Sequence, residues 1–294
     1  MTTMEREITG PGGRTLLVHE AGDPDGALVV YHHGTPQSGL MLESWEDHAA
    51  TSRVRLVSYD RPGYGGSTPQ PGRTVADAAG DVAAIADALG AERFATFGAS
   101  GGGPHALACA ALLGDRVAAA AVLGTIAPFA AEGLNFFAGM GRDNWIEFGA
   151  ALVGRETLEP MLAAEIREFA DAPAASVADG IRTLISRPDQ DVLDRGLTQW
   201  LHATMVQGTA AGPDGWVDDD FAAVEPWGFD LAGIAIPVLV AHGRQDRFVP
   251  VSHGEWVAGR IPRVEARIGE ADGHLTLIVH RVPAVLDWLR ERLA

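Results

Sequence analysis

Short runs of β-branched and apolar residues alternate with longer Ala- and Leu-rich stretches over the first 124 residues. Runs of this length and composition are typical of buried strands, whereas apolar residues that recur every three or four positions are typical of helices. We expect the first two strands to form a hairpin. The pattern predicts strands at 14–20, 27–32, 54–59, 93–97 and 117–124, and helices at 74–89 and 102–113.

The strand pattern stops after Pro128 and returns only at residue 236. Alternating strands and helices favour a mostly parallel sheet flanked by helices, so the chain is predicted to have an α/β fold. The core would comprise residues 1–126 and 229–294, interrupted by an inserted helical cap at 127–228. Cap helices are predicted at 144–153, 157–169, 177–185 and 192–206. The remaining predicted elements are strands at 236–241 and 264–268 and helices at 253–260 and 284–293.

Composition and charge narrow the classes of function. The 294 residues are 47% hydrophobic and 21% charged, which is typical of a globular protein with a large core. All 22 basic residues are Arg, so Schiff-base and P-loop lysine chemistry is excluded. The net charge of −17 repels nucleic acids and anionic lipid surfaces. We therefore expect a small-molecule substrate, with no nucleic-acid or membrane partner. The sequence does not determine the oligomeric state, and it is compatible with a homodimer.

The sequence shows no signal for export. Cys109 is the single cysteine, which permits no intrachain disulfide bond. Residues 1–7 lack the basic and apolar regions of a signal peptide, and the longest apolar run, near 117–122, is too short to span a bilayer. These features predict a cytoplasmic protein.

A G-x-S-x-G pattern lies between a predicted strand and a predicted helix. Residues 98–102 read Gly-Ala-Ser-Gly-Gly, with Ser100 at the centre. Small residues on either side of a serine allow the sharp strand-to-helix turn that exposes a nucleophilic hydroxyl. The alternative interpretation is a glycine-rich helix start in which Ser100 is only an N-cap. The strand before it and the helix after it favour the nucleophile.

Together with two later loops, this pattern resembles the α/β-hydrolase superfamily in its serine-nucleophile branch. Residues 242–250 are similar to the family's acid loop, and residues 273–277 are similar to its histidine loop. The resemblance implies Ser100 as nucleophile, Asp246 as the acid and His274 as the base, in the family's order along the chain. Other residues could take these roles, but none follows a strand in the expected register. The rival carboxylates are Asp230 and Asp272, and the rival imidazoles are His242, His253 and His280.

The resemblance also implies an oxyanion hole. Residues 33–36, His-Gly-Thr-Pro, are similar to the family's H-G-x-P loop, in which the x residue supplies a backbone N–H. We expect the amides of Thr35 and Gly101 to stabilise the oxyanion. His33 is expected to be structural, and Arg61 is expected to form a structural ion pair. No spacing suggests a metal site or a dinucleotide motif, so no metal or cofactor is implied.

Aromatic residues are concentrated in the predicted cap, where Trp145, Phe148 and Trp200 are the candidates for substrate contact. The spacing of Trp145 and Phe148 also fits packing within the cap. An aromatic cap above a serine nucleophile favours an uncharged, small to medium apolar ester, thioester or lactone.

These observations predict a serine hydrolase that cleaves carboxylic esters through an acyl-Ser100 intermediate. One alternative is a C–C bond hydrolase or another non-ester reaction on the same triad. A second is an amidase similar to the proline iminopeptidases, although the residues around Ser100 depart from their pattern. A third is a small-molecule receptor without turnover. Serine at position 100, where related enzymes carry Asp, disfavours action on haloalkanes and epoxides.

Overall fold

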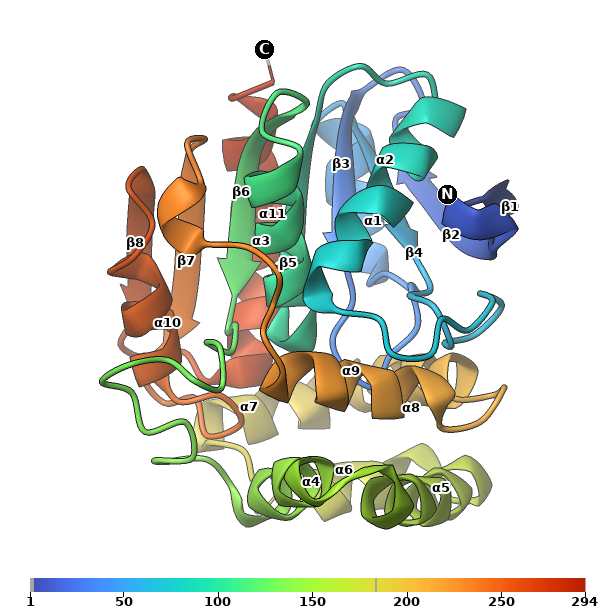
Figure 1. Ribbon diagram of the computed structural model, residues 1–294, viewed down its shortest axis with the longest axis vertical. Helices are drawn as coiled ribbons and strands as arrows, with labels where there is room; N and C mark the ends of the chain where they lie inside the picture. The colour runs from blue at the N-terminus through green and yellow to red at the C-terminus, as the bar shows by residue number, and fades with distance from the viewer. Residues whose placement is uncertain (1–2, 183, 294) are drawn as a thin grey trace.

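The computed structural model describes residues 3–182 and 184–293, except for the side chains of 177–179 (Figure 1). Its centre is an eight-stranded sheet in the order β1-β2-β4-β3-β5-β6-β7-β8. β2 runs antiparallel to its neighbours, and all pairs from β4 to β8 are parallel. The predicted α/β class with a mostly parallel sheet is confirmed. The strands are β1 Met4–Thr9, β2 Thr15–Gly22, β3 Ala27–His32, β4 Val54–Tyr59, β5 Phe94–Ala99, β6 Val117–Leu123, β7 Val238–Gly243 and β8 Val264–Gly269.

The predicted hairpin between the strands at 14–20 and 27–32 is wrong. β2 pairs with β1 and β4, whereas β3 lies between β4 and β5. The hairpin joins β1 to β2 instead, and β1 was not predicted. Its residues are mostly exposed and Ile8 is its single buried side chain, so β1 lacks the apolar run that identifies the inner strands.

Five helices cover the two faces of the sheet: α1 Glu43–Thr51, α2 Ala78–Ala88, α3 Gly103–Leu112, α10 Val251–Ala258 and α11 His274–Arg290. Successive side chains of a strand point to opposite faces. Val29 and Tyr31 of β3 accordingly pack in one core cluster with residues of α1 and α11, while Leu28 and Val30 pack in another with residues of α2. Burying both faces explains why the inner strands are mainly apolar.

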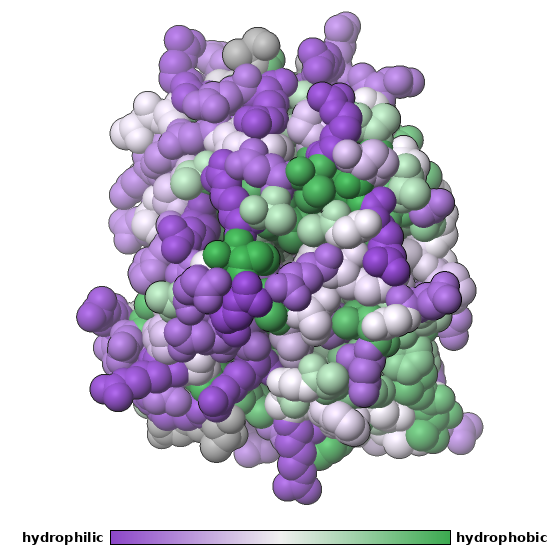
Figure 2. Space-filling view, turned by 90° about the vertical axis from the view of Figure 1, so that its left-hand side faces the viewer, coloured by the Kyte–Doolittle hydropathy of each residue, from purple (hydrophilic) through white to green (hydrophobic). Residues whose placement is uncertain are grey.

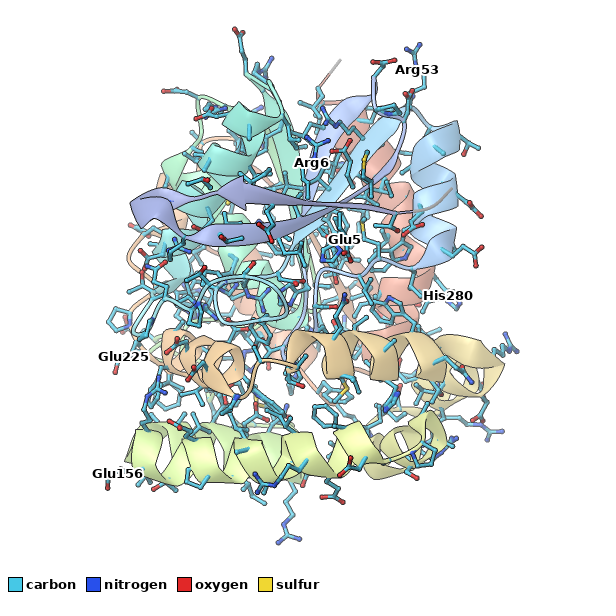
Figure 3. The ribbon with its side chains drawn as sticks, turned by 90° about the vertical axis from the view of Figure 1, so that its right-hand side faces the viewer. Glu5, Arg6, Arg53, Glu156, Glu225 and His280 are labelled. Atoms are coloured by element: carbon cyan, nitrogen blue, oxygen red, sulfur yellow. The ribbon has the colours of Figure 1, made fainter. Side chains whose placement is uncertain are left out.

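The segment between β6 and β7 is helical, and it lies over the carboxyl ends of the parallel strands (Figure 1). Figure 3 shows α8 and α9 next to the core, with α5 in a layer farther out. The cap helices are α4 Arg142–Val153, α5 Arg155–Asp171, α6 Ala174–Ile181, α7 Arg187–Val192, α8 Thr198–Gly208 and α9 Asp214–Val224. The inserted helical cap thus covers the sheet edge at which the candidate catalytic loops end.

Several helices differ from the predicted elements. α1 was not predicted, and the helix predicted at 192–206 is divided between the end of α7 and α8. α9 was missed because it buries Asp218, Asp219 and Asp220, which contradict the apolar pattern of a core-facing helix. α11 begins at His274, ten residues before the predicted start. Pro283 lies inside it and marks the point at which a pattern-based helix would be broken.

The surface is mainly hydrophilic on the face shown in Figure 2, where hydrophobic side chains reach the surface in limited areas. Within the described part of the chain, every helix is too short or too polar to traverse a lipid bilayer.

Candidate active site

Ser100 lies at the sharp turn between β5 and α3. Its φ of 53° is in the left-handed region, where few non-glycine residues are found. A side chain at Gly98 would overlap the Gly102 carbonyl, and one at Gly102 would overlap the carbonyl of His32. The two glycines are therefore required for the close packing that places Ser100 above the carboxyl end of β5.

His274 and Asp246 form a buried hydrogen-bonded pair. His274 begins α11 after β8, and Asp246 lies in the loop after β7. The distance from His274 Nδ1 to Asp246 Oδ2 is 2.7 Å, and the Val249 amide donates to Asp246 Oδ1 at 2.8 Å. The Asp246 carboxylate is placed to accept the proton on Nδ1, and in that tautomer Nε2 carries the free lone pair.

The environment of His274 favours its charged form. Burial opposes the imidazolium, but the carboxylate of Asp246 outweighs it and raises the pKa of His274 above 6.5. The negative charge of Asp189 acts in the same direction. The ring of Phe248 packs against the imidazole, with ring centroids 5.2 Å apart. A histidine held in this way is suited to take up a proton during a reaction near neutral pH.

Ser100 and His274 line the same cavity, which has a volume of about 700 Å³. A Cβ placed at Gly34 would lie 3.5 Å from Ser100 Cβ, so the predicted oxyanion loop approaches the serine closely. Among the described residues, the Ser100 hydroxyl has no hydrogen-bond partner. Bonds between a nucleophile and its base often tighten only in the substrate complex, so this geometry is compatible with a triad.

The two predicted oxyanion donors also lie together. A Cβ placed at Gly101 would lie 3.4 Å from the backbone nitrogen of Thr35. His33 supports this loop from beneath, because its Nδ1 lies 2.8 Å from the Gly34 carbonyl and its Nε2 accepts from the Arg61 amide at 3.1 Å. The Thr35–Pro36 peptide bond is cis. The structure thus brings the Thr35 and Gly101 amides to the turn that carries Ser100.

Asp219 of α9, which the sequence analysis missed, ties the cap to the oxyanion loop. Its carboxylate accepts hydrogen bonds from Arg61, Arg73, Tyr64 and the Thr35 hydroxyl, the last at 2.6 Å. Burial favours the neutral acid, but the two guanidinium groups hold the pKa of Asp219 well below its usual range. Arg61 therefore forms the structural ion pair expected of it. Its partner lies 158 residues away, so no local pattern could identify it.

Asp189 of α7 is a second residue that the sequence analysis missed, and it holds the start of α11. Its side chain is fully buried. Its carboxylate accepts from the backbone amides of His274 and Thr276, at 3.0 and 2.9 Å, and from the Ser186 hydroxyl at 2.9 Å. The first N–H groups of a helix lack intrahelical partners, so this contact fixes the turn that bears His274. Ser186 and Asp189 form a capping box at the start of α7, and nothing in this local spacing points to the second helix.

We expect Asp189→Asn to reduce the free energy of unfolding by about 2 to 3 kcal/mol, because hydrogen bonds to a buried charge are lost and an amide NH₂ group faces backbone donors. Denaturant unfolding measures the effect. Asp191→Asn is the matched control, since Asp191 is exposed on the same helix. Equal stability of the two variants would contradict the assigned role.

Two of the three aromatic residues predicted to contact the substrate lie at the cavity. Phe148 and Trp200 line the cavity, whereas Trp145 does not. Trp145 is 52% exposed, its indole N–H donates to the Phe137 carbonyl at 3.0 Å, and its ring packs on that of Phe137. The predicted substrate contact of Trp145 is therefore corrected: its ring packs on the segment before α4, outside the cavity.

No three His, Cys, Asp or Glu side chains in the described parts of the chain are grouped as metal ligands. The lone Cys109 is buried in the core, and burial raises the pKa of its thiol far above the usual value. This thiol is therefore protonated at neutral pH.

Comparison with known proteins identifies the family. The sequence model of one protein family, described as the alpha/beta hydrolase fold, matches residues 27–281. The chain belongs to the alpha/beta hydrolase family. This α/β hydrolase is 29% identical over 250 residues to a non-heme chloroperoxidase of Streptomyces lividans, and 27% identical over 251 residues to a bifunctional esterase/perhydrolase of Acinetobacter calcoaceticus. Each match covers 83% of this chain and 83% of the relative.

A solved structure shares the fold over nearly the whole chain. A thermophilic esterase from Thermogutta terrifontis superposes with a TM-score of 0.70 at 22% identity, covering 99% of this chain and 100% of that one. The family and the named relatives support an enzyme of the hydrolase class.

Proposed function

We propose that this α/β hydrolase cleaves carboxylic esters through an acyl-Ser100 intermediate. The observation that carries the proposal is the pairing of His274 with Asp246 at the cavity that Ser100 lines. The amides of Thr35 and Gly101, beside the same serine, complete the set of groups that acyl transfer needs.

The reaction would begin with attack of Ser100 Oγ on the ester carbonyl carbon while His274 Nε2 accepts the hydroxyl proton. The carbonyl oxygen would then become an oxyanion, stabilised by hydrogen bonds from the amides of Thr35 and Gly101. Collapse of this intermediate breaks the bond to the alcohol oxygen, which takes the proton from His274. Water, activated by His274 in turn, hydrolyses the acyl-serine and restores the hydroxyl.

Asp246 would act without a change in its own protonation. Its hydrogen bond to Nδ1 selects the tautomer in which Nε2 is free, and its charge stabilises the imidazolium formed during attack. Asp219 would keep the oxyanion loop in place through the Thr35 hydroxyl.

The cavity supports a substrate with a sizeable apolar part. Phe148, Trp200 and Phe248 are among its lining residues, and a cavity of this volume accommodates a medium-sized acyl or alcohol group. One relative is named as a bifunctional esterase/perhydrolase, and the match covers 83% of both chains. This similarity supports ester hydrolysis as the reaction.

Relative rates on a small substrate panel test the proposed bond type. We expect p-nitrophenyl butyrate to be hydrolysed faster than an amino-acid p-nitroanilide or a linear β-diketone, because the oxyanion hole and base suffice for a good alcohol leaving group. Turnover of the diketone or the anilide without ester hydrolysis would contradict the proposal. It would favour the C–C hydrolase or the amidase, respectively.

A further inference from the structure

The cap side of the cavity carries many carboxyl groups and, among the described lining residues, no arginine. Asp219 is already neutralised by Arg61 and Arg73. The others have no arginine partner in the described parts of the structure. The acidic residues that line the cavity are Asp143, Glu147, Glu165, Glu168, Asp219 and Asp220.

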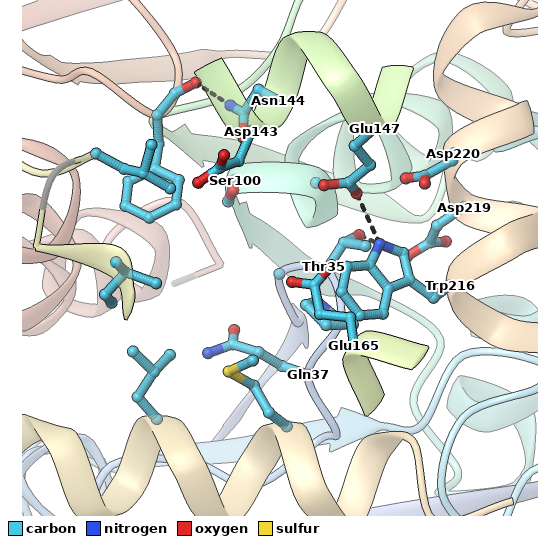
Figure 4. A pocket seen from close by; sticks show the side chains of 18 of the residues that line it. Thr35, Gln37, Ser100, Asp143, Asn144, Glu147, Glu165, Trp216, Asp219 and Asp220 are labelled. Carbon is cyan, nitrogen blue, oxygen red and sulfur yellow. Dashed lines mark hydrogen bonds between the residues drawn. The ribbon is translucent and has the colours of Figure 1, made fainter. Parts of the chain in front are cut away.

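Asp220 is the member of this group whose buried carboxyl, beside that of Glu147, has one oxygen without a hydrogen-bond donor in the described part of the chain. Its side chain is 2% exposed, and its Oδ2 is buried without a hydrogen-bond donor among the described residues. A buried carboxyl oxygen without a donor costs free energy, so a donor supplied from the cavity would be stabilising. Figure 4 shows the carboxyls of Glu147 and Asp220 pointing toward each other, with Glu147 Oε1 also accepting from the Trp216 indole at 2.7 Å.

These carboxyl groups influence one another. Burial, the negative charge of Glu147 and a hydrogen bond with the Glu147 carboxyl raise the pKa of Asp220 well above its usual value. Desolvation, followed by the charges of Glu147, Asp143 and Glu168, raises the pKa of Glu165 to about 7. The cluster therefore holds protons near neutral pH, and a cation that binds there would displace them.

We propose that Glu147, Glu165 and Asp220 form a subsite for a protonated amine carried by the substrate. An ammonium group offers several N–H donors, which match the unpaired Asp220 oxygen and the neighbouring glutamate oxygens in charge-assisted hydrogen bonds. The inference deepens the proposed function, on which it rests for the assignment of the cavity to the substrate of Ser100.

The subsite changes the expected substrate from uncharged to amphipathic. Phe248, Trp200 and Leu184 supply apolar surface to the same cavity, while the three carboxyls come from α4, α5 and α9. A substrate with an amine at one end and an apolar segment near the ester bond fits both walls. The sequence gave no indication of this, because the acidic residues are spread from position 143 to position 220 and only the folded cap gathers them.

Calorimetric titration with simple probes tests the subsite without relying on turnover. The probes are n-hexylammonium, hexan-1-ol and hexyltrimethylammonium, and the proteins are the wild type, the double variant Glu147→Gln/Asp220→Asn and the control Glu156→Gln. Glu156 is exposed on the outer cap helix α5 (Figure 3). Near-UV circular dichroism establishes that each variant is folded.

We expect the wild type and Glu156→Gln to bind hexylammonium about tenfold or more tightly than hexan-1-ol, a difference of about 1.4 kcal/mol. Binding should release protons, seen as heats that depend on the buffer. The double variant should lose both the preference and the proton release. No preference in the folded wild type, an equal loss in Glu156→Gln, or equally tight binding of hexyltrimethylammonium would overturn the subsite.

Repeating the titration with Ser100→Ala separates this inference from the proposed reaction. Retained amine preference in that variant supports the subsite even if esters prove not to be substrates. Ester hydrolysis by the wild type with no amine preference would reject the subsite and leave the esterase assignment standing.

Discussion

Replacing Ser100 with alanine is expected to lower kcat/KM for p-nitrophenyl butyrate by about 10⁶-fold, because the members of a catalytic triad act as a unit. The variant should keep its fold, since alanine fits the space of serine at the turn after β5. Ester hydrolysis measured together with thermal unfolding separates loss of chemistry from loss of structure.

Ser176→Ala is the matched control for this experiment. Ser176 lines the same cavity from α6. The control should retain nearly full activity. Substantial ester hydrolysis by a folded Ser100→Ala variant would mean that another group is the nucleophile.

Asp246→Asn is expected to reduce kcat by about 10⁴-fold with little change in fold. The asparagine NH₂ group would face Nδ1 and favour the tautomer with the proton on Nε2, which cannot accept the Ser100 proton. The residual activity should also change its pH dependence. A base works above its pKa and fails as the pH falls through it. Without the carboxylate that raises the pKa of His274, burial dominates, so the acid limb should move to lower pH.

The control for Asp246 is the rival carboxylate nearest to the histidine in sequence. Asp272 lies two residues before His274, but its carboxylate is paired with Arg281 at 2.7 Å. Asp272→Asn should therefore leave both kcat and the position of the acid limb nearly unchanged. A larger loss of kcat in Asp272→Asn than in Asp246→Asn would show that Asp246 is not the acid of the triad.

Local patterns were sufficient for the parts of the fold that are themselves local. β3 and β4 were predicted with their observed bounds, since both are short runs rich in apolar and β-branched residues. The turn at Ser100 was also predictable, because the glycines at 98 and 102 are required by backbone atoms that approach within the same strand-turn-helix unit or from the adjacent strand.

The features that escaped prediction depend on contacts between distant segments. Asp189 and Asp219 are buried because partners far along the chain satisfy their carboxylates, and nothing in their own neighbourhoods identifies those partners. The proposed subsite of Glu147, Glu165 and Asp220 is assembled in the same way, from α4, α5 and α9. Trp145 and Phe148 share a helix at favourable spacing, yet the packing of the Trp145 ring on Phe137 decides that only Phe148 reaches the cavity.

The most direct test of the account is labelling with a fluorophosphonate, followed by mass spectrometry of the digested protein. An activated serine attacks the phosphorus, the P–F bond breaks with release of fluoride, and the phosphonyl group remains on the serine oxygen as a covalent adduct. We expect one adduct, on the peptide that contains Ser100, formed quickly in the wild type, much more slowly in His274→Ala and not at all in Ser100→Ala. An adduct on a different residue, or labelling at Ser100 that is equally fast without His274, would contradict the proposed catalytic site.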